Sequence, residues 1–307
     1  MARRPGIGFI APSGQNLDDA GLARAADYFR ARGYRVVVPA AARRAHQRFA
    51  GTDAERLAAL HAMAARDDVD LVMAVRGGYG LTRLLDRIDY AALAAGGKTY
   101  IGHSDFTALL CAGYARARLR GIAGPTAAFD FGAAAPSAFT EHHFWRVIEG
   151  DAVDVEVAGA VPRGAGARIA GRLWGGNLAM LAHLAGTPYL PRLRGGILFV
   201  EDVNEHPYRV ERMLYQLLHA GVLARQKALL LGDFSGYRLG PNDNGYDFEA
   251  MVAHLAARLP IPVLTGLPFG HVRDKLSLPF GARAIVEIAG DGYRLRYRAG
   301  RGGAGAP

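Results

Sequence analysis

The first part of the chain alternates short apolar runs with amphipathic stretches, and this rhythm limits the possible folds more than any other feature. Short apolar runs are typical of buried strands, and apolar residues three and four apart are typical of helices. The expected elements, in chain order, are a strand at Gly6–Ala11, a helix at Asp18–Arg32, a strand at Tyr34–Pro39, a helix at Thr52–Arg66 and a strand at Val69–Val75. Thr52 and Glu55 have the spacing of a capping box at the start of the second helix. This order predicts an α/β fold with a parallel sheet covered by helices on both faces, and functional loops at the carboxyl ends of the strands.

The composition changes between Ala133 and Gly166, where Ala, Gly and Pro are dense around one aromatic helix candidate at Glu141–Ile148. Such a change marks a domain boundary. We therefore expect an N-terminal α/β domain at 1–135, a linker at 136–165 and a C-terminal domain at 166–307.

The C-terminal part contains both helical and strand patterns. We expect a loop and then a helix within 171–186, a strand at 196–203, a helix at 208–220 and strands near 228–231 and 261–264. Residues 282–297 alternate like two antiparallel strands, with Gly290, Asp291 and Gly292 as the turn. The glycine-rich tail after Ala299 is expected to be disordered.

Length and composition fit a two-domain globular protein. The chain has 307 residues, half of them hydrophobic, and a domain usually contains roughly 100 to 200 residues. No apolar run approaches the ~18 residues of a membrane span. Cys111 is the one cysteine, which excludes an internal disulfide and a cysteine metal cluster. These features predict a cytoplasmic protein with no membrane partner.

The formal charge of +9 comes mostly from arginine, since Lys98, Lys227 and Lys275 are the only lysines. The arginines are scattered through amphipathic segments, and no basic run alternates with aromatic residues to make a stacking platform for bases. We therefore expect solvated helix faces and no nucleic-acid partner, and the positive charge can attract small anionic substrates.

Ser104 stands at the turn between an expected strand at Thr99–Ile101 and an expected helix at Phe106–Arg116. A serine at such a turn exposes its hydroxyl beside the first amides of the helix, which suits a nucleophile. The match to the G-x-S-x-G elbow of hydrolases is partial, because Phe106 replaces the last glycine. A serine that caps the helix by accepting a backbone N–H fits the position equally well.

The sequence Arg76-Gly77-Gly78-Tyr79-Gly80 follows the strand expected at 69–75. Its spacing fits neither G-x-G-x-x-G nor a Walker A loop. Glycines after a strand let backbone N–H groups come close to a ligand, as an oxyanion hole requires. A tight turn with positive φ explains the same glycines.

A serine nucleophile needs a base, and the base needs an orienting acid. His271 stands out among the histidines because it lies on a rigid loop just past an expected strand, and His206 is a second candidate. His103 is a poor base for the adjacent serine, because neighbouring side chains on an extended strand point to opposite faces. Glu201 and Asp202 leave an apolar strand on opposite faces, so only one can be the orienting acid. No histidine spacing fits a zinc site, so no metal is expected.

Five motifs together resemble one known family. In chain order they are Arg76-Gly77-Gly78-Tyr79-Gly80, Ile101-Gly102-His103-Ser104-Asp105-Phe106, Trp174-Gly175-Gly176-Asn177-Leu178, the run from Glu201 to Leu214, and Gly266-Leu267-Pro268-Phe269-Gly270-His271. This set resembles the LD-carboxypeptidase family, and most closely its murein tetrapeptide carboxypeptidases. The motifs occur in family order and cover nearly the whole chain.

The resemblance implies a triad with Ser104 as nucleophile, Glu201 as orienting acid and His271 as general base. It also implies a flavodoxin-like N-terminal domain that carries Ser104, and a smaller, swivelling-type β/α C-terminal domain that carries Glu201 and His271. The catalytic site is then expected at the interface between the domains. The family preference selects Glu201 over Asp202, which the strand pattern leaves open.

The implied reaction is release of terminal D-alanine from the L-centre of a diamino acid, in muropeptides recycled in the cytoplasm. For the oxyanion hole we expect the backbone amides of Gly78 and Asp105. Arg76 is a candidate bidentate partner for the terminal carboxylate of the substrate, and an arginine that braces the glycine loop is the alternative. The mechanism needs no metal or other cofactor, and the resemblance suggests a homodimer.

Two other functions remain open. A relative resembling the microcin C immunity protein would use the same triad to cleave an acyl-sulfamoyl adenylate, which calls for an aromatic platform under the adenine. No aromatic-rich insertion lies near the catalytic motifs. The other possibility is a non-enzymatic two-domain protein that binds a small ligand in its cleft, and the presence of all three triad candidates counts against it.

Overall fold

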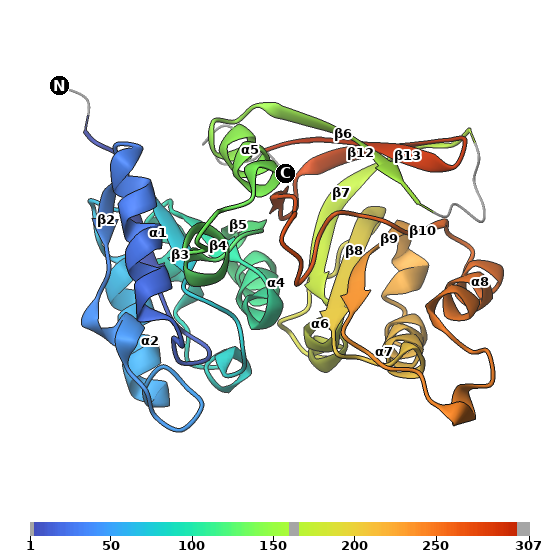
Figure 1. Cartoon of the computed structure of the whole chain (residues 1–307), viewed down its shortest axis with the longest axis horizontal. Helices are drawn as coiled ribbons and strands as arrows, with labels where there is room; N and C mark the ends of the chain where they lie inside the picture. The colour runs from blue at the N-terminus through green and yellow to red at the C-terminus, as the bar shows by residue number, and fades with distance from the viewer. Residues whose placement is uncertain (1–2, 160–165, 300–307) are drawn as a thin grey trace. The chain divides into compact units, whose positions relative to one another are not determined.

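A computed structural model describes residues 3–159 and 166–299 of the chain (Figure 1). The chain divides into two compact units. Unit 1 contains the residues up to Glu141 together with Pro188–Pro191, and unit 2 contains His142–Thr187 and the residues from Arg192 onward. The tail expected to be disordered falls, after Ala299, outside the described residues.

Unit 1 is built on parallel strands, as the sequence predicts. They are β1 (Gly6–Ile10), β2 (Arg35–Val37), β3 (Leu71–Ala74), β4 (Thr99–Gly102) and β5 (Arg120–Ala123). Their spatial order is β5-β4-β3-β1-β2, and each neighbouring pair is parallel. This is the flavodoxin-like order, which places its functional loops at the carboxyl ends of the strands.

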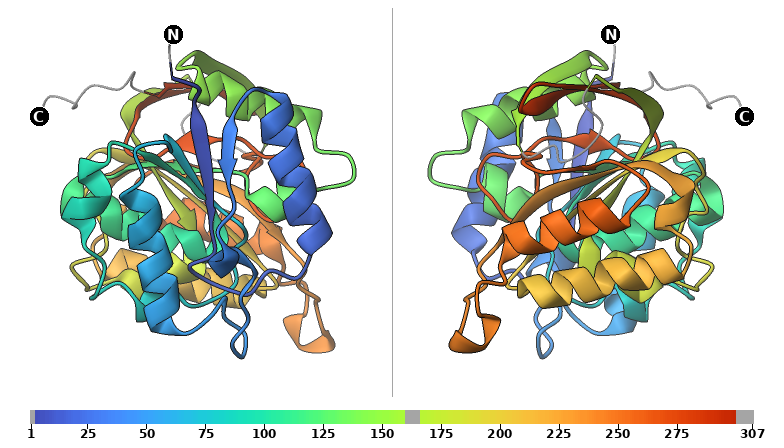
Figure 2. Two further views of the ribbon diagram at one scale, coloured as in Figure 1. Left: turned by 90° about the vertical axis from the view of Figure 1, so that its left-hand side faces the viewer. Right: turned by 90° about the vertical axis from the view of Figure 1, so that its right-hand side faces the viewer.

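Helices cover both faces of this sheet. The helices of unit 1 are α1 (Asp19–Ala31), α2 (Asp53–Ala64), α3 (Tyr90–Ala95) and α4 (Thr107–Ala117). The left view of Figure 2 shows α1 and α2 on opposite sides of β1 and β2. The capping box of Thr52 and Glu55 is present at the start of α2, with both of its reciprocal bonds. The strands and helices expected from the sequence rhythm up to Val75 are therefore present, and α1 and α2 each begin with a capping side chain and have a buried face.

Unit 2 contains a mixed sheet. Its strands are β6 (Ala152–Ala158), β7 (Arg168–Asn177), β8 (Gly196–Val203), β9 (Gln226–Ser235), β10 (Val263–Leu264), β12 (Arg283–Ala289) and β13 (Gly292–Arg298). The order is β10-β9-β8-β7-β12-β13-β6. Strands β7 to β10 pair in parallel, and β12, β13 and β6 continue the sheet in antiparallel fashion. The hairpin expected over 282–297 is thus confirmed as β12 and β13.

Helices α6 (Leu178–Leu184), α7 (Pro207–His219) and α8 (Phe248–Arg258) belong to unit 2, and α7 and α8 lie side by side in the right view of Figure 2. Helix α5 (Ala138–Ile148) contains the boundary between the units, and a two-residue strand, β11 (Leu278–Pro279), precedes β12. No helix among the described residues is long and apolar enough to cross a membrane.

The segment expected to be a linker, 136–165, contains α5 and β6 instead, apart from 160–165, which lie outside the described residues. Strand β6 forms because its valines alternate with acidic residues, and Val153 and Val157 are buried while Asp154 and Glu156 are not. The density of Ala and Gly around this segment hid that alternation. With β6 and most of α5 included, unit 2 is not the smaller of the two units.

The prediction of a loop at the start of 171–186 is also wrong. Residues 171–177 belong to strand β7, which runs directly into α6. Its glycines suggested a loop, but they allow β7 to pack closely on β8. A Cβ on Gly175, whose φ is +145°, would lie 1.8 Å from the carbonyl oxygen of Phe199. Glycine in a strand often marks such a close approach.

Candidate active site

Ser104 lies at the end of β4, where the 3-10 turn η3 (Ser104–Phe106) leads into α4. Its φ is +63°, a left-handed conformation that costs a residue with a side chain about 1–3 kcal/mol. Such strain is concentrated at functional sites. The N-cap residue of α4 is Phe106 and that of η3 is His103, and neither turn has a side-chain capping bond. The alternative of Ser104 as a capping serine is therefore not supported.

Two glycines leave space around this turn. A Cβ on Gly77 would lie 2.6 Å from Cβ of Ser104 and 2.8 Å from its Oγ. A Cβ on Gly102 would lie 2.8 Å from the ring of Phe106 and 2.9 Å from Cβ of Ala74. Gly77 therefore places the backbone of the loop 76–80 directly against the serine, and Gly102 allows Phe106 to pack beneath the turn.

The loop 76–80 is bonded to the loop that follows β1. The amide of Gly14 donates to the carbonyl of Gly77 at 3.2 Å, and Nη1 of Arg76 donates to the carbonyl of Gln15 at 3.1 Å. Gly78 has a φ of +109°, which favours glycine. Arg76 is half-buried, and its bond to Gln15 braces the loop. Within residues 3–159 and 166–299 this is the hydrogen bond that its guanidinium makes, and the group has five N–H donors.

Asp105 and His103 stabilise the chain on either side of Ser104. Oδ2 of the buried Asp105 accepts a hydrogen bond of 3.0 Å from the amide of Leu81, and burial raises the pKa of this carboxyl. Nδ1 of His103 donates to the carbonyl of Gly124 at 2.9 Å. His103 thus connects the end of β4 to the end of β5 and is itself buried, which gives this residue a structural role that the sequence did not indicate.

In unit 2, Glu201 and His271 contact each other directly. Glu201 lies near the end of β8 and is 0% exposed. His271 follows Gly270, where a Cβ would lie 3.3 Å from Oε2 of Glu201. Nδ1 of His271 donates to that oxygen at 2.8 Å. This bond fixes the tautomer, so that Nε2 of the neutral ring is the nitrogen able to accept a proton.

The pKa of His271 reflects two opposing effects. Burial alone lowers it, but the hydrogen bond from the ring to Glu201 and the charge of that carboxylate outweigh burial. The net result is a pKa above the ordinary value for histidine. The pair is therefore suited to stabilise the imidazolium that forms when the base takes a proton.

Asp202 has different partners. Its Oδ2 accepts the amide of Ala179 in α6 at 2.9 Å, and its Oδ1 accepts the amide of Val203 at 2.9 Å. Burial, together with the charge of Glu201, raises the pKa of Asp202 to about 6, although these hydrogen bonds oppose the change. Asp202 is thus bonded to the start of α6, whereas Glu201 is bonded to the histidine.

Asn177 is a site residue for which sequence reasoning gave no role. Its Nδ2 donates to Oδ1 of Asp202 at 3.0 Å and to Oε1 of Glu201 at 3.3 Å, while its Oδ1 accepts the amide of Met180 and caps α6. It therefore orients both carboxylates. The signal was its place in the motif Trp174-Gly175-Gly176-Asn177-Leu178, at the junction of a strand and a helix.

His206, the second candidate base, lies beside another acid. Its Nε2 donates to Oδ2 of Asp243 at 3.1 Å, and its Nδ1 accepts the amide of Tyr208 at 3.4 Å as the N-cap of α7. Both ring nitrogens are thus engaged in local structure. Among residues 3–159 and 166–299, no group of three or more His, Cys, Asp or Glu side chains is arranged to bind a metal ion.

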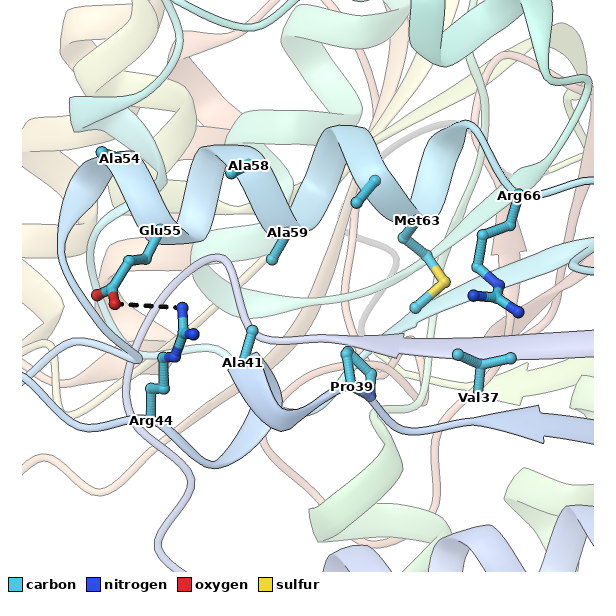
Figure 3. Close-up of a pocket in the computed structure, with 11 residues that line it drawn as sticks. Val37, Pro39, Ala41, Arg44, Ala54, Glu55, Ala58, Ala59, Met63 and Arg66 are labelled. Carbon is cyan, nitrogen blue, oxygen red and sulfur yellow. Dashed lines mark ion pairs between the residues drawn. The ribbon is translucent and has the colours of Figure 1, made fainter.

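A groove of about 520 Å³ lies in unit 1 between α2 and the segment that follows β2 (Figure 3). Small side chains of α2 form one wall, and an ion pair of 3.2 Å between Arg44 and Glu55 lies at one end. Its lining includes neither Ser104 nor the loop 76–80. The groove is therefore separate from the candidate catalytic residues.

The N-terminal and C-terminal parts of the chain each match a known domain family. Residues 7–124 match the LD-carboxypeptidase N-terminal domain, and residues 170–286 match the LD-carboxypeptidase C-terminal domain. The first range contains Ser104 and the second contains Glu201 and His271.

Individual proteins agree with this assignment. The chain is 35% identical to the murein tetrapeptide carboxypeptidase of Pseudomonas aeruginosa over 258 residues, which are 81% of each protein. The crystal structure of muramoyltetrapeptide carboxypeptidase from Oxalobacter formigenes is similar with a TM-score of 0.89 and 46% identity, covering 95% of this chain and 98% of that one. The microcin C7 self-immunity protein of Escherichia coli is 27% identical over 272 residues, 78% of this chain and 77% of that protein. The chain belongs to the LD-carboxypeptidase family.

Proposed function

We propose that this protein is a serine LD-carboxypeptidase that releases terminal D-alanine from murein tetrapeptides in peptidoglycan recycling. The observation that carries the proposal is the hydrogen bond of 2.8 Å between His271 and the buried Glu201, which prepares Nε2 of the histidine as a base. The strained backbone of Ser104 supports its role as the nucleophile. The similarity to the murein tetrapeptide carboxypeptidase of Pseudomonas aeruginosa supports the substrate.

The proposed reaction has two halves. Nε2 of His271 takes the proton from Oγ of Ser104 while this oxygen attacks the scissile carbonyl, and Glu201 stabilises the imidazolium. The same nitrogen then gives its proton to the departing amine of D-alanine, and an acyl-enzyme remains. A water molecule, deprotonated by His271, attacks the acyl group and restores the serine.

The loops around Ser104 provide the remaining groups. The amides of Gly78 and Asp105 donate to the oxyanion that develops on the carbonyl oxygen, where each such donor is worth about 10² to 10³ in kcat. Arg76 pairs with the terminal carboxylate of the substrate, which explains cleavage only at the chain end. The net charge of +9 favours encounter with an anionic peptide.

The proposal extends to organisation and location. We assign the nucleophile to an N-terminal domain and the acid and base to a C-terminal domain, and propose that the protein acts as a cytoplasmic homodimer. Its partner molecule is a small muropeptide, with no nucleic acid or membrane involved. All catalytic groups are side chains and amides of the protein, so the reaction needs no cofactor.

The test is incubation of the purified protein with a murein tetrapeptide, with mass spectrometry to follow free D-alanine. The same peptide with an amidated C-terminus should react far more slowly, because Arg76 loses its carboxylate partner. An acyl-sulfamoyl adenylate serves as the competing substrate. Hydrolysis of that adenylate without release of D-alanine would favour an immunity-type hydrolase, and binding of the peptide without turnover would favour a binding protein.

A further inference from the structure

Arg56 is a buried arginine on α2 whose guanidinium contacts two loops. The residue is 1% exposed. Its Nη1 donates to the carbonyls of Pro12 and Gly80, the latter at 3.0 Å, and its Nη2 donates to Oδ1 of Asp53 at 2.5 Å. Arginine is almost never this buried unless its charge is paired and its donors are used.

The two carbonyls belong to the loops that follow β1 and β3, which are neighbours in the sheet. The same loops are joined by the bond from Gly14 to Gly77. Arg56 therefore connects Pro12 to Gly80, at the far end of the loop 76–80, while Gly77 at its near end lies against Ser104. Both ends of this loop have fixed contacts, and Gly78 lies between them.

The fit at Gly80 is close. Its φ is +142°, and a Cβ there would lie 2.7 Å from Nη1 of Arg56 and 2.9 Å from the ring of Phe49. The guanidinium also lies over that ring, 4.9 Å from its centroid. Only an arginine side chain presents enough donors in one plane to bond two carbonyls and a carboxylate at once.

We propose that Arg56 is a positioning residue, which fixes the backbone of residues 77–80 so that the amide of Gly78 meets the transition state. This inference rests on the proposed function, because it takes Gly78 as an oxyanion donor. A flexible glycine loop loses this alignment unless other groups restrain it, since preorganised donors account for the effect of an oxyanion hole. The bond from Leu81 to Asp105 is a second restraint on the same segment.

The first test is Arg56→Lys, which keeps the charge and most of the packing but cannot bond both carbonyls and Asp53 in the same geometry. We expect kcat to fall about 10- to 100-fold with KM changed less than about twofold, because oxyanion donors act mainly in the transition state. Gly80→Ala perturbs the same contact from the loop side and should show the same pattern. Circular dichroism and thermal unfolding verify that each variant is folded.

Arg83→Lys is the matched control. Arg83 shares the partners of Arg56 at the surface, since its Nε donates to Asp53 at 2.9 Å and it lies 4.8 Å from the ring centroid of Phe49. The described hydrogen bonds and ion pairs of its side chain go to Asp53, and none goes to Pro12 or Gly80. Its backbone amide donates to the carbonyl of Gly80 at 3.3 Å, and the substitution keeps that bond. We expect kcat of this variant to equal that of the wild type.

A second measurement does not depend on the peptide substrate. A fluorophosphonate modifies a reactive serine through a phosphorus centre whose oxygen occupies the oxyanion hole, so its rate of reaction with Ser104 should fall in Arg56→Lys and Gly80→Ala in parallel with kcat. Absence of D-alanine release by the wild type would refute the proposed function and leave this labelling test in place. Folded Arg56→Lys and Gly80→Ala proteins with wild-type labelling rates would overturn the role of Arg56, whatever the substrate is.

Discussion

Nδ1 of His271 donates a hydrogen bond of 2.8 Å to Oε2 of Glu201, which has no exposure to solvent. The two residues are 70 positions apart in the chain. Because the carboxylate is buried and also accepts from Asn177, it has little freedom to leave the histidine. Glu201 therefore determines which ring nitrogen carries the proton before any substrate binds.

Exchange of the two carboxylates for amides should separate their roles. In Glu201→Gln the amide presents an N–H to Nδ1, which favours the tautomer with the proton on Nε2, and we expect kcat to fall about 10⁴-fold. Asp202→Asn removes the oxygen that accepts the amide of Ala179, which lies away from the histidine. We therefore expect kcat within about tenfold of the wild type and a free energy of unfolding lower by about 1–3 kcal/mol. D-alanine release and thermal unfolding of both variants measure the difference. A larger loss of kcat in Asp202→Asn would show that the orienting acid is assigned wrongly.

The pH dependence should follow the raised pKa of His271. The base acts only when neutral, so kcat/KM should rise with pH through the pKa of the free enzyme. Because Glu201 raises that pKa, the midpoint should lie above about 6.5, the ordinary value for histidine, and should move to lower pH in Glu201→Gln.

His206→Ala is the control for this profile, since His206 is bonded to Asp243 instead. In this variant kcat/KM should still rise with pH as it does in the wild type. If that rise disappears in His206→Ala and persists in His271→Ala, the base is His206.

Replacement of Ser104 should abolish turnover and reveal the strain of its backbone. Both Ser104→Ala and Ser104→Gly should lose about 10⁶ in kcat, as for other triad nucleophiles. Glycine adopts the observed φ of +63° without steric cost, so Ser104→Gly should be more stable than Ser104→Ala by about 1 kcal/mol. Chemical denaturation compares the two proteins. Equal stabilities would mean that this backbone conformation is not strained, and turnover by folded Ser104→Ala would exclude the serine mechanism.

Gly77→Ala should impair catalysis through contact with the nucleophile. The new methyl group would lie 2.8 Å from Oγ of Ser104, so the hydroxyl must move, and we expect kcat to fall at least about 100-fold. Gly240→Ala is a matched control, because a Cβ there has its nearest neighbour at 3.9 Å and the residue has a φ of −125°. Steady-state kinetics of both variants provide the comparison. Wild-type kcat in Gly77→Ala would show that the loop does not lie against the reactive serine.

Local sequence patterns predicted strands β1 to β4 and helices α1, α2 and α4 of unit 1, but not α3 or β5. The alternation of strands and helices, the capping box of Thr52 and the position of Ser104 at a strand-to-helix turn all follow from residues close together in the chain. The same reasoning failed at β7 and β6. In β7, glycines allow close packing against β8, and no local pattern reports that neighbour. In β6, the dense Ala and Gly around the segment hid the alternation of its valines with acidic residues.

The sequence by itself determined the candidate residues and, through the order of its motifs, the family. Only the tertiary structure decided which of them meet: that Glu201 contacts His271 while Asp202 contacts α6, that Asn177 bonds both acids, and that Arg56 reaches Pro12, 44 positions away. The left-handed backbone of Ser104, with a φ of +63°, was equally not predictable from local patterns. Such contacts depend on how strands and loops distant in sequence fold against one another. Burial and hydrogen bonding, and not local propensity, therefore assign these side chains their partners.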